Sequence, residues 1–165
     1  MTDSSSLSIT AACKTDVPLI LSLINELADY ERLRHEAVAT EASLHEALFG
    51  SKPGAEAVIA RVDGEPAGFA LFFHNFSTFL GRRGLYLEDL FVRPTFRGRA
   101  IGKSLLSYLA ALAVERGCGR FEWQVLDWNK SARDFYERLG AQANSAWISY
   151  RMSGEALERL AAARV

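Results

Sequence analysis

Cysteine is scarce in this sequence, and so are the other residues of a metal or disulfide framework. The two cysteines, Cys13 and Cys118, lie far apart in the chain and offer neither a disulfide framework nor zinc-ligand spacing. The three histidines are scattered without ligand spacing, so no metal is expected. The net charge is only −1, which argues against a surface for nucleic acid or acidic membranes.

Long apolar runs are also missing. The longest, "GFALFF" and "YLAALAV", are too short to span a bilayer, so no membrane partner is expected. The N-terminal stretch "MTDSSSLSIT" lacks the basic and apolar regions of a signal peptide, which favours a cytoplasmic protein. Residues 1–6 are expected to be flexible. With 49% hydrophobic and 24% charged residues, the chain is predicted to be one globular domain over residues 1–165.

Turn and capping residues divide the first half of the chain into short elements. Apolar residues at helical spacing predict a helix that begins after Thr15 or Asp16. A Thr40-x-x-Ser43 cap begins a second helix that ends at Gly50. Alternating apolar residues predict strands over residues 7–12 and 84–92, and a hairpin over residues 55–76 with Asp63-Gly64 as its turn.

The second half is expected to alternate strands with helices. The predicted elements are a helix from about Ile101 to Gly117, a strand over 120–126, a helix over 129–140, a strand over 146–152 and a terminal helix. Hairpins first and crossover units later predict an α/β fold, with a mixed sheet and helices on both of its faces.

The stretch "FRGRAIGKS", residues 96–104, connects a predicted strand to a predicted helix. It resembles the end of a nucleotide-binding P-loop, but Arg97 occupies the position where that motif requires glycine. Small residues at Gly98, Ala100 and Gly102 would let an anion reach the unpaired N–H groups of the helix. Taken alone, the stretch is equally compatible with a plain turn that carries solvated cations.

Four motifs in one order make the reading more specific. "LINELADYE", "LYLEDLFV", "FRGRAIG" and "WNKSARDFYERLGA" resemble the GCN5-related N-acetyltransferase (GNAT) superfamily, and within it the spermidine/spermine (diamine) and thialysine acetyltransferases. The resemblance covers nearly the whole chain. It implies a mostly antiparallel mixed sheet with a splayed strand pair for the coenzyme, acetyl-coenzyme A as co-substrate, and a homodimer.

The resemblance also implies which residues hold the coenzyme. In the family, exposed backbone of the strand before the loop pairs with the pantetheine arm, and the loop itself holds the pyrophosphate. One departure is Ala100, where the family usually has glycine; alanine is harmless there only if its φ is negative. The coenzyme-binding residues so implied are Leu90, Phe91, Val92, Arg97, Gly98, Arg99, Ala100, Ile101, Gly102, Lys103, Asn129 and Tyr136.

Two catalytic residues follow from the same resemblance. Glu88 matches the family's general base, which an alkylammonium needs before it can attack a thioester. Tyr136 matches a tyrosine whose phenol, with an ordinary pKa of about 10, protonates the departing thiolate. The plainer alternatives are a solvated strand carboxylate and a core tyrosine. Since strand side chains alternate, Glu88 and Asp89 are expected to point to opposite faces.

The implied acceptor residues are Tyr30, Glu31, Glu88, Glu122, Trp123 and Gln124. Where the polyamine enzymes carry an acid and a tryptophan before "LYLED", this chain has Ser77 and Phe79, which favours a diamine or lysine-like amine over a long polyamine. The expected function is direct acetyl transfer to the primary amine of a small substrate. Acetylation of a protein or peptide amine, and a non-catalytic acyl-coenzyme A sensor, remain as alternatives.

Overall fold

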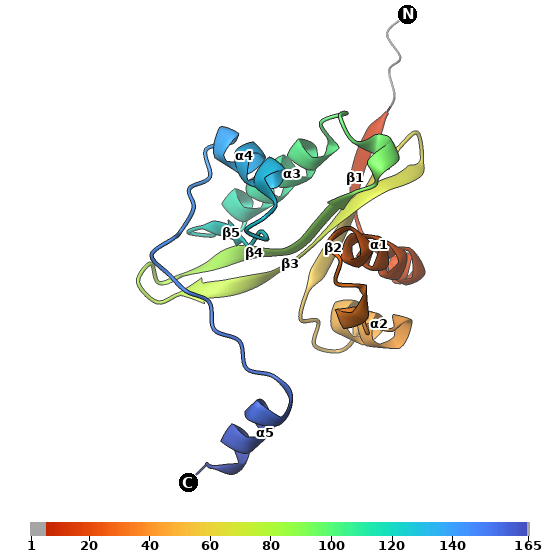
Figure 1. Ribbon diagram of the computed structural model, residues 1–165. Coiled ribbons are helices and arrows are strands. Elements are labelled where there is room, and N and C mark those ends of the chain that lie inside the picture. Colours follow the sequence, from red (N-terminus) through yellow and green to blue (C-terminus); the bar gives the residue numbers. More distant parts are fainter. Residues whose placement is uncertain (1–5, 165) are drawn as a thin grey trace, which may run out of the picture. The chain divides into compact units, whose positions relative to one another are not determined.

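The computed structural model describes residues 6–164 (Figure 1). Residue contacts divide the chain into two units, Met1–Gln124 and Val125–Val165. Of the residues expected to be flexible, 1–5 lie outside the described part. Ser6 is tied down, because its backbone N–H donates a hydrogen bond to Asp63 Oδ1 at 2.8 Å.

The first unit contains a five-stranded sheet with the strands in sequence order. All neighbours pair antiparallel except β4 and β5, which pair in parallel. The sheet is therefore mixed and mostly antiparallel, as predicted. Its strands are β1 (Leu7–Ala11), β2 (Glu56–Val62), β3 (Glu65–Ser77), β4 (Arg82–Val92) and β5 (Phe121–Trp123).

The turns and caps that the sequence predicted are present in this unit. Asp63 and Gly64 both have positive φ, of 52° and 85°, which suits the tight turn between β2 and β3. Helix α2 (Glu41–Phe49) begins with a reciprocal cap, in which Ser43 N donates to Thr40 Oγ1 at 3.1 Å and Thr40 N donates to Ser43 Oγ at 2.9 Å. The β2–β3 turn and the start of α2 are therefore where the sequence predicted them.

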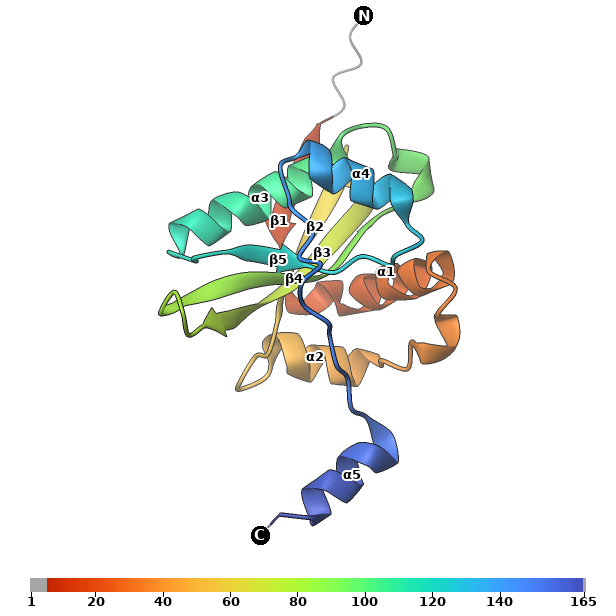
Figure 2. The same ribbon diagram turned by 60° about the vertical axis from the view of Figure 1, so that its left-hand side comes forward.

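Helices cover both faces of the sheet, as expected for this fold class. In Figures 1 and 2, α1 (Val17–Tyr30) and α2 lie on one face and α3 (Ile101–Glu115) lies on the other. We call the side of the sheet covered by α1 and α2 the α1 face. Its core comprises Val17, Ile20, Leu23, Leu27, Leu44, Leu48, Ala57, Ile59, Phe69 and Phe91.

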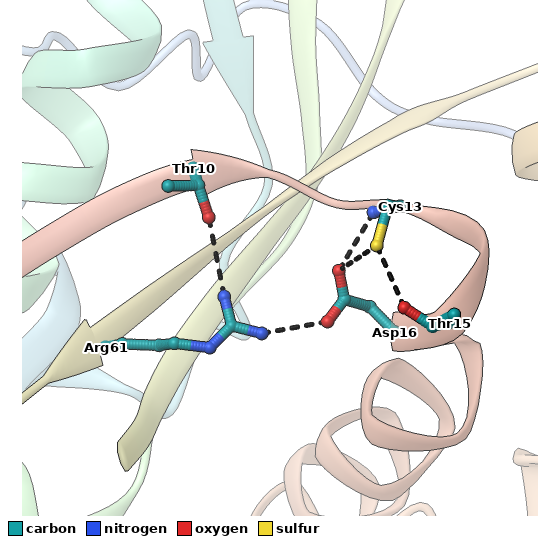
Figure 3. Close-up of polar contacts among 5 residues, drawn as sticks. All are labelled: Thr10, Cys13, Thr15, Asp16 and Arg61. Carbon is teal, nitrogen blue, oxygen red and sulfur yellow. Dashed lines mark hydrogen bonds and ion pairs between the residues drawn. The ribbon is translucent and has the colours of Figure 1, made fainter. Parts of the chain in front are cut away.

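A polar cluster joins the start of α1 to the sheet (Figure 3). Asp16 Oδ2 accepts hydrogen bonds from the Cys13 backbone N–H at 2.9 Å and from its thiol at 3.2 Å. Its other oxygen accepts from Arg61 Nη2 at 2.8 Å. Burial is the largest single effect and by itself would raise the pKa of Asp16, but the contacts with Cys13 and Arg61 together lower it. The cluster fixes where α1 leaves the edge of the sheet.

The second unit contains two helices, α4 (Lys130–Arg138) and α5 (Gly154–Ala162). The strand predicted over 146–152 is wrong: within the described residues no strand pairs with this segment, and a strand exists only where a neighbour completes its hydrogen bonds.

In the first unit, β5 is shorter than predicted, because its pairing with β4 covers only Phe121–Trp123. Among residues 6–164, no helix has the length and apolar character needed to cross a membrane.

Candidate active site

The loop between β4 and α3 leads into a helix start whose backbone amides lack helical partners. A short 3₁₀ turn at Pro94–Phe96 follows β4, and α3 begins at Ile101. Gly98 has φ of 80° and Ala100 has φ of 60°, and left-handed residues next to a right-handed helix arrange successive N–H groups into an anion-binding nest. The first helical bond to return to the loop runs from Ser104 N to Ala100 O, so the preceding N–H groups of the 15-residue helix have no partner within it.

The residues of this loop fit a pyrophosphate. Two cations, Arg99 and Lys103, belong to this loop and to the first turn of α3, whereas the Arg97 side chain contacts Tyr30 of α1. A Cβ placed on Gly98 would meet no atom within 4 Å, which means that the space over the loop backbone is open. Amides, the positive end of the helix dipole and cations together favour a dianion. Gly98 and Ala100, with Arg99 between them, both take the left-handed conformation just before α3 begins.

Ala100 departs from the family in a way that costs free energy. Its φ of 60° and ψ of 12° lie in the left-handed region, where a Cβ approaches the following carbonyl. The condition under which alanine would be harmless, a negative φ, is therefore not met. The strain lies in the loop, at the residue before the first turn of α3.

Ala100→Gly is expected to stabilise the protein by about 0.5–1 kcal/mol, since relief of about 1–2 kcal/mol of left-handed strain exceeds the greater unfolded-state entropy of glycine. The measurement is the midpoint of urea unfolding. Ala111→Gly, within α3, is the matched control and is expected to destabilise by about 1 kcal/mol. Equal effects of the two substitutions would contradict the strained backbone at Ala100.

The strand before the loop separates from its neighbour. β4 and β5 pair from Leu85 with Phe121 to Leu87 with Trp123, while β4 continues to Val92. The β5 side of β4 beyond Leu87 therefore has no strand partner in the first unit. This is the splayed pair that the resemblance implied. Leu90, Phe91 and Val92 therefore pair with β3 but not with β5, and the Val92 carbonyl accepts a hydrogen bond from Arg97 Nε at 3.0 Å. Their role in binding the pantetheine arm stays a prediction.

A β-bulge interrupts β4 at Glu88. Leu87 pairs with Phe72 and Asp89 pairs with Leu71, so Glu88 has no partner on β3. Paired residues share a face, and Leu71 packs with the core on the α1 face, so Asp89 also lies on that face. In a regular strand Leu87 and Asp89 would share a face, but here they do not. Simple alternation therefore breaks between Leu87 and Asp89, and the expectation that Glu88 and Asp89 point to opposite faces stays a prediction.

Asp89, beside the bulge, lies close enough to Glu88 and Glu31 for their negative charges to raise its pKa. Burial and the negative charges of Glu88 and Glu31 together raise the pKa of Asp89 to about 6, and burial is the largest of these causes. Burial also raises the pKa of Glu31. We call Glu31, Glu88 and Asp89 the acidic cluster. Such a cluster has a high negative potential, which attracts an ammonium group.

The end of α1 is shaped so that Tyr30 and Glu31 face this region. Arg32 takes the left-handed conformation with φ of 62°, and Leu33 N donates to Ala28 O at 2.8 Å, which closes the helix as a glycine commonly does. Tyr30 is the last helical residue and is 42% exposed. Two of the predicted acceptor residues are thus brought to the α1 face beside β4.

An ion pair that the sequence reading missed holds α1 against the start of the loop. Arg93 Nη2 contacts Glu26 Oε1 at 2.7 Å and Arg93 Nε contacts Glu26 Oε2 at 3.0 Å, while Nη1 donates to Pro66 O at 3.0 Å. A bidentate guanidinium–carboxylate pair fixes both distance and orientation. In the sequence, Glu26 stands out only by its i-to-i+4 spacing from Tyr30 on α1. This spacing does not identify Arg93 as its partner.

The predicted segment on β5 contributes unequally. Glu122 Oε2 accepts from Asn75 Nδ2 at 2.9 Å and pairs with Arg120 Nε at 2.8 Å. These contacts engage its carboxylate with side chains of β3 and of the residue before β5. The rings of Phe121 and Trp123 lie 5.0 Å apart, so those two side chains share the opposite face of β5. Gln124 follows the end of the strand.

The two predicted site residues of the second unit lie on one helix. Asn129 is the N-cap of α4, where its Oδ1 accepts from Ala132 N at 3.2 Å. Tyr136 lies further along α4, and its ring contacts that of Phe135 at 5.5 Å. The coenzyme roles of both residues stay predictions. Within residues 6–164, no group of three or more His, Cys, Asp or Glu side chains is arranged to hold a metal ion.

Comparison with known proteins agrees with this geometry. Residues 20–141 match the Acetyltransferase (GNAT) family. The chain is 38% identical to thialysine N-epsilon-acetyltransferase of Sus scrofa, over 93% of this chain and 96% of the relative. It is 34% identical to L-ornithine N5-acetyltransferase of Arabidopsis thaliana, over 92% of this chain and 86% of the relative.

A solved structure has the same fold. An integron cassette protein from the mobile metagenome of V. cholerae superposes with a TM-score of 0.80 at 29% identity, over 94% of this chain and 98% of that one. The amide nest, the splayed strands and the acidic cluster thus occur in a chain whose relatives transfer acetyl groups to amines. This chain belongs to the acetyltransferase (GNAT) family and is an N-acyltransferase.

Proposed function

We propose that this protein transfers the acetyl group of acetyl-coenzyme A directly to the side-chain primary amine of a small, lysine-like or ornithine-like substrate. The acidic cluster is the observation that carries the proposal. Its three carboxylates lie at the bulge of β4 and the end of α1, next to the strand edge on which the coenzyme would lie. The relatives named for thialysine and ornithine support an amino-acid acceptor.

The chemistry assigns one role to each residue. The coenzyme supplies an activated acetyl group as a thioester. Glu88 accepts a proton from the substrate ammonium, directly or through water, and so frees the nitrogen lone pair. As the new C–N bond forms and the C–S bond breaks, Tyr136 donates its phenolic proton to the departing sulfur. The nitrogen loses a second proton to solvent and keeps one as the amide N–H. Tyr136 regains a proton and Glu88 releases its own through solvent, and no covalent enzyme intermediate is required.

The β3–β4 hairpin favours a short acceptor over a long polyamine. Ser77 is only 6% exposed, and its Oγ accepts from Leu80 N at 3.2 Å, so its hydroxyl stabilises the turn. Phe79, at 95% exposure, carries no charge for a distant ammonium. Neither residue replaces the acid that would hold the far end of a polyamine.

We further propose that both units act as one catalytic domain in a cytoplasmic homodimer. The proposed roles belong to residues of both units, Glu88 in the first and Tyr136 in the second. Large apolar side chains in the second unit, among them Trp147, Ile148 and Tyr150, are 76–94% exposed, which is typical of a surface that another chain covers. Cys13 and Cys118 are free thiols, as is usual in the cytoplasm.

An amine panel with acetyl-coenzyme A tests the proposal, with released thiol as the readout. Thialysine, ornithine and lysine are expected to react with the highest kcat/KM, putrescine more slowly, and spermidine and a lysine-containing peptide the least. The reason is that the acidic cluster binds a single ammonium while the hairpin offers no second acidic site.

Two outcomes would contradict the assignment. A preference for the peptide would favour acetylation of protein amines. Binding of acetyl-coenzyme A by calorimetry, without thiol release from any amine, would favour the acyl-coenzyme A sensor.

A further inference from the structure

The side chain of Arg97 does not extend over the phosphate loop to which it belongs. Its Nε donates to Val92 O at 3.0 Å, and its guanidinium carbon lies 4.6 Å from the centre of the Tyr30 ring. The same carbon lies 5.8 Å from the centre of the Phe91 ring. The guanidinium therefore lies between the end of α1 and the end of β4, on the side of the acceptor residues.

The neighbouring cation of the loop behaves differently. The guanidinium carbon of Arg99 lies 5.7 Å from the centre of the Phe96 ring, so its contact is within the loop. Arg97 and Arg99 are two residues apart and equally charged, but only Arg97 contacts α1 in the described chain. Charge alone does not explain the position of Arg97, whereas a planar group that stacks on Tyr30 does.

Most donors of the guanidinium remain available. Arginine has five N–H donors, and in the described part of the chain the hydrogen bond to Val92 O uses only the one on Nε. The two Nη groups form a fork that fits a carboxylate with two parallel hydrogen bonds. Stacking on Tyr30 and the bond to Val92 O hold the plane of that fork, which lowers the entropy cost of binding.

An amino-acid acceptor needs such a group. Its ammonium end suits the acidic cluster, but the same cluster repels its carboxylate. Tyr30 directly precedes Glu31 in the sequence, and Phe91 lies two residues after Asp89. The Arg97 guanidinium therefore lies over rings that are close in sequence to the acidic cluster. We propose that Arg97, stacked on Tyr30, is a specificity-determining residue that binds the carboxylate of an amino-acid acceptor. This inference rests on the proposed small-amine function and deepens it.

The test compares acceptors that differ only by a carboxylate. Lysine is paired with cadaverine and ornithine with putrescine, and kcat/KM is measured for each in the unaltered protein, Arg97→Gln and Arg97→Lys. Arg97→Gln is expected to reduce the lysine-to-cadaverine ratio roughly tenfold, because the bidentate charged hydrogen bonds are lost. Arg97→Lys is expected to recover only part of that ratio, since ammonium has charge without the fork.

Two further variants separate recognition from general damage. Arg99→Gln is expected to raise the KM for acetyl-coenzyme A and to leave the lysine-to-cadaverine ratio unchanged. Tyr30→Phe keeps the ring under the guanidinium and is expected to keep the ratio, whereas Tyr30→Leu is expected to lower it. Circular dichroism and thermal unfolding of each variant establish that it is folded before its kinetics are compared.

A truncated donor distinguishes the acceptor role from a phosphate role. S-acetyl-pantetheine has the thioester but no pyrophosphate, and with it the Arg97→Gln effect on the ratio is expected to persist. An unchanged ratio in Arg97→Gln, or an effect seen only with acetyl-coenzyme A, would overturn the carboxylate role and leave the proposed function standing. Absence of turnover with every amine would overturn the proposed function itself, and this inference with it.

Discussion

Asp89→Asn is expected to raise the free energy of unfolding at pH 8 by up to about 3 kcal/mol. Burial and the charges of Glu88 and Glu31 raise the pKa of Asp89 from 3.8 to about 6, and each pKa unit corresponds to about 1.4 kcal/mol. At pH 8 the carboxylate is ionised in the folded protein despite this penalty. Asparagine fills the same space without the charge, so the penalty disappears.

The sign of the pH dependence follows from proton binding. Between pH 3.8 and about 6 the folded protein holds a proton on Asp89 that the unfolded chain has lost, so stability falls as the pH rises through this window. The difference in stability between Asp89→Asn and the unaltered protein should therefore be small at pH 4, grow up to about pH 6 and remain constant above it. Other groups titrate in both proteins, so their contributions largely cancel in the difference.

Urea unfolding at pH 4, 6 and 8 measures this difference. Asp29→Asn is the matched control, because Asp29 lies on α1 with a side chain that is 66% exposed, and its stability change should be small at every pH. The KM for the amine is expected to rise in Asp89→Asn, since one of the three attracting charges is lost. If Asp89→Asn destabilised the protein at pH 8, or if the stability difference did not vary with pH, the raised pKa of Asp89 would be contradicted.

Local sequence signals predicted most of the elements in the fold. The Thr40–Ser43 capping box and the Asp63-Gly64 turn each depend on a few adjacent residues, and both occur where the sequence placed them. The loop proposed to bind the coenzyme was recognisable for the same reason. Its small residues, its cations and the following helix are contiguous, so the amide nest is encoded within one short stretch.

Features that depend on a partner strand were not predictable in this way. The bulge at Glu88 exists because Leu71 and Phe72 of β3 take successive places opposite Asp89 and Leu87, and no pattern within β4 records that register. Residues 146–152 alternate as a strand does, but alternation supplies no hydrogen-bond partner. The position of Arg97 over Tyr30 joins residues 67 positions apart, and the sequence shows only that both exist.

Tyr136→Phe is expected to reduce kcat about 100-fold, with less than a twofold change in the dissociation constant of acetyl-coenzyme A. The phenol is the group that protonates the departing sulfur in the proposed mechanism, and proton transfer by a positioned side chain contributes about 100- to 10,000-fold to rate. Phenylalanine keeps the ring beside Phe135 and removes only the hydroxyl, so α4 should retain its packing.

Steady-state kinetics with thialysine, and calorimetry with acetyl-coenzyme A, measure the two quantities. Tyr108→Phe, on α3, is the control for loss of a phenol outside the proposed chemistry, and its kcat should stay within twofold. The substitution affects expulsion of the thiolate, and a more acidic thiol leaves without needing a proton. With an acetyl thioester of such a thiol, the kcat of Tyr136→Phe should therefore be closer to the kcat of the unaltered protein. A kcat that does not change would show that Tyr136 does not protonate the sulfur and that another group does.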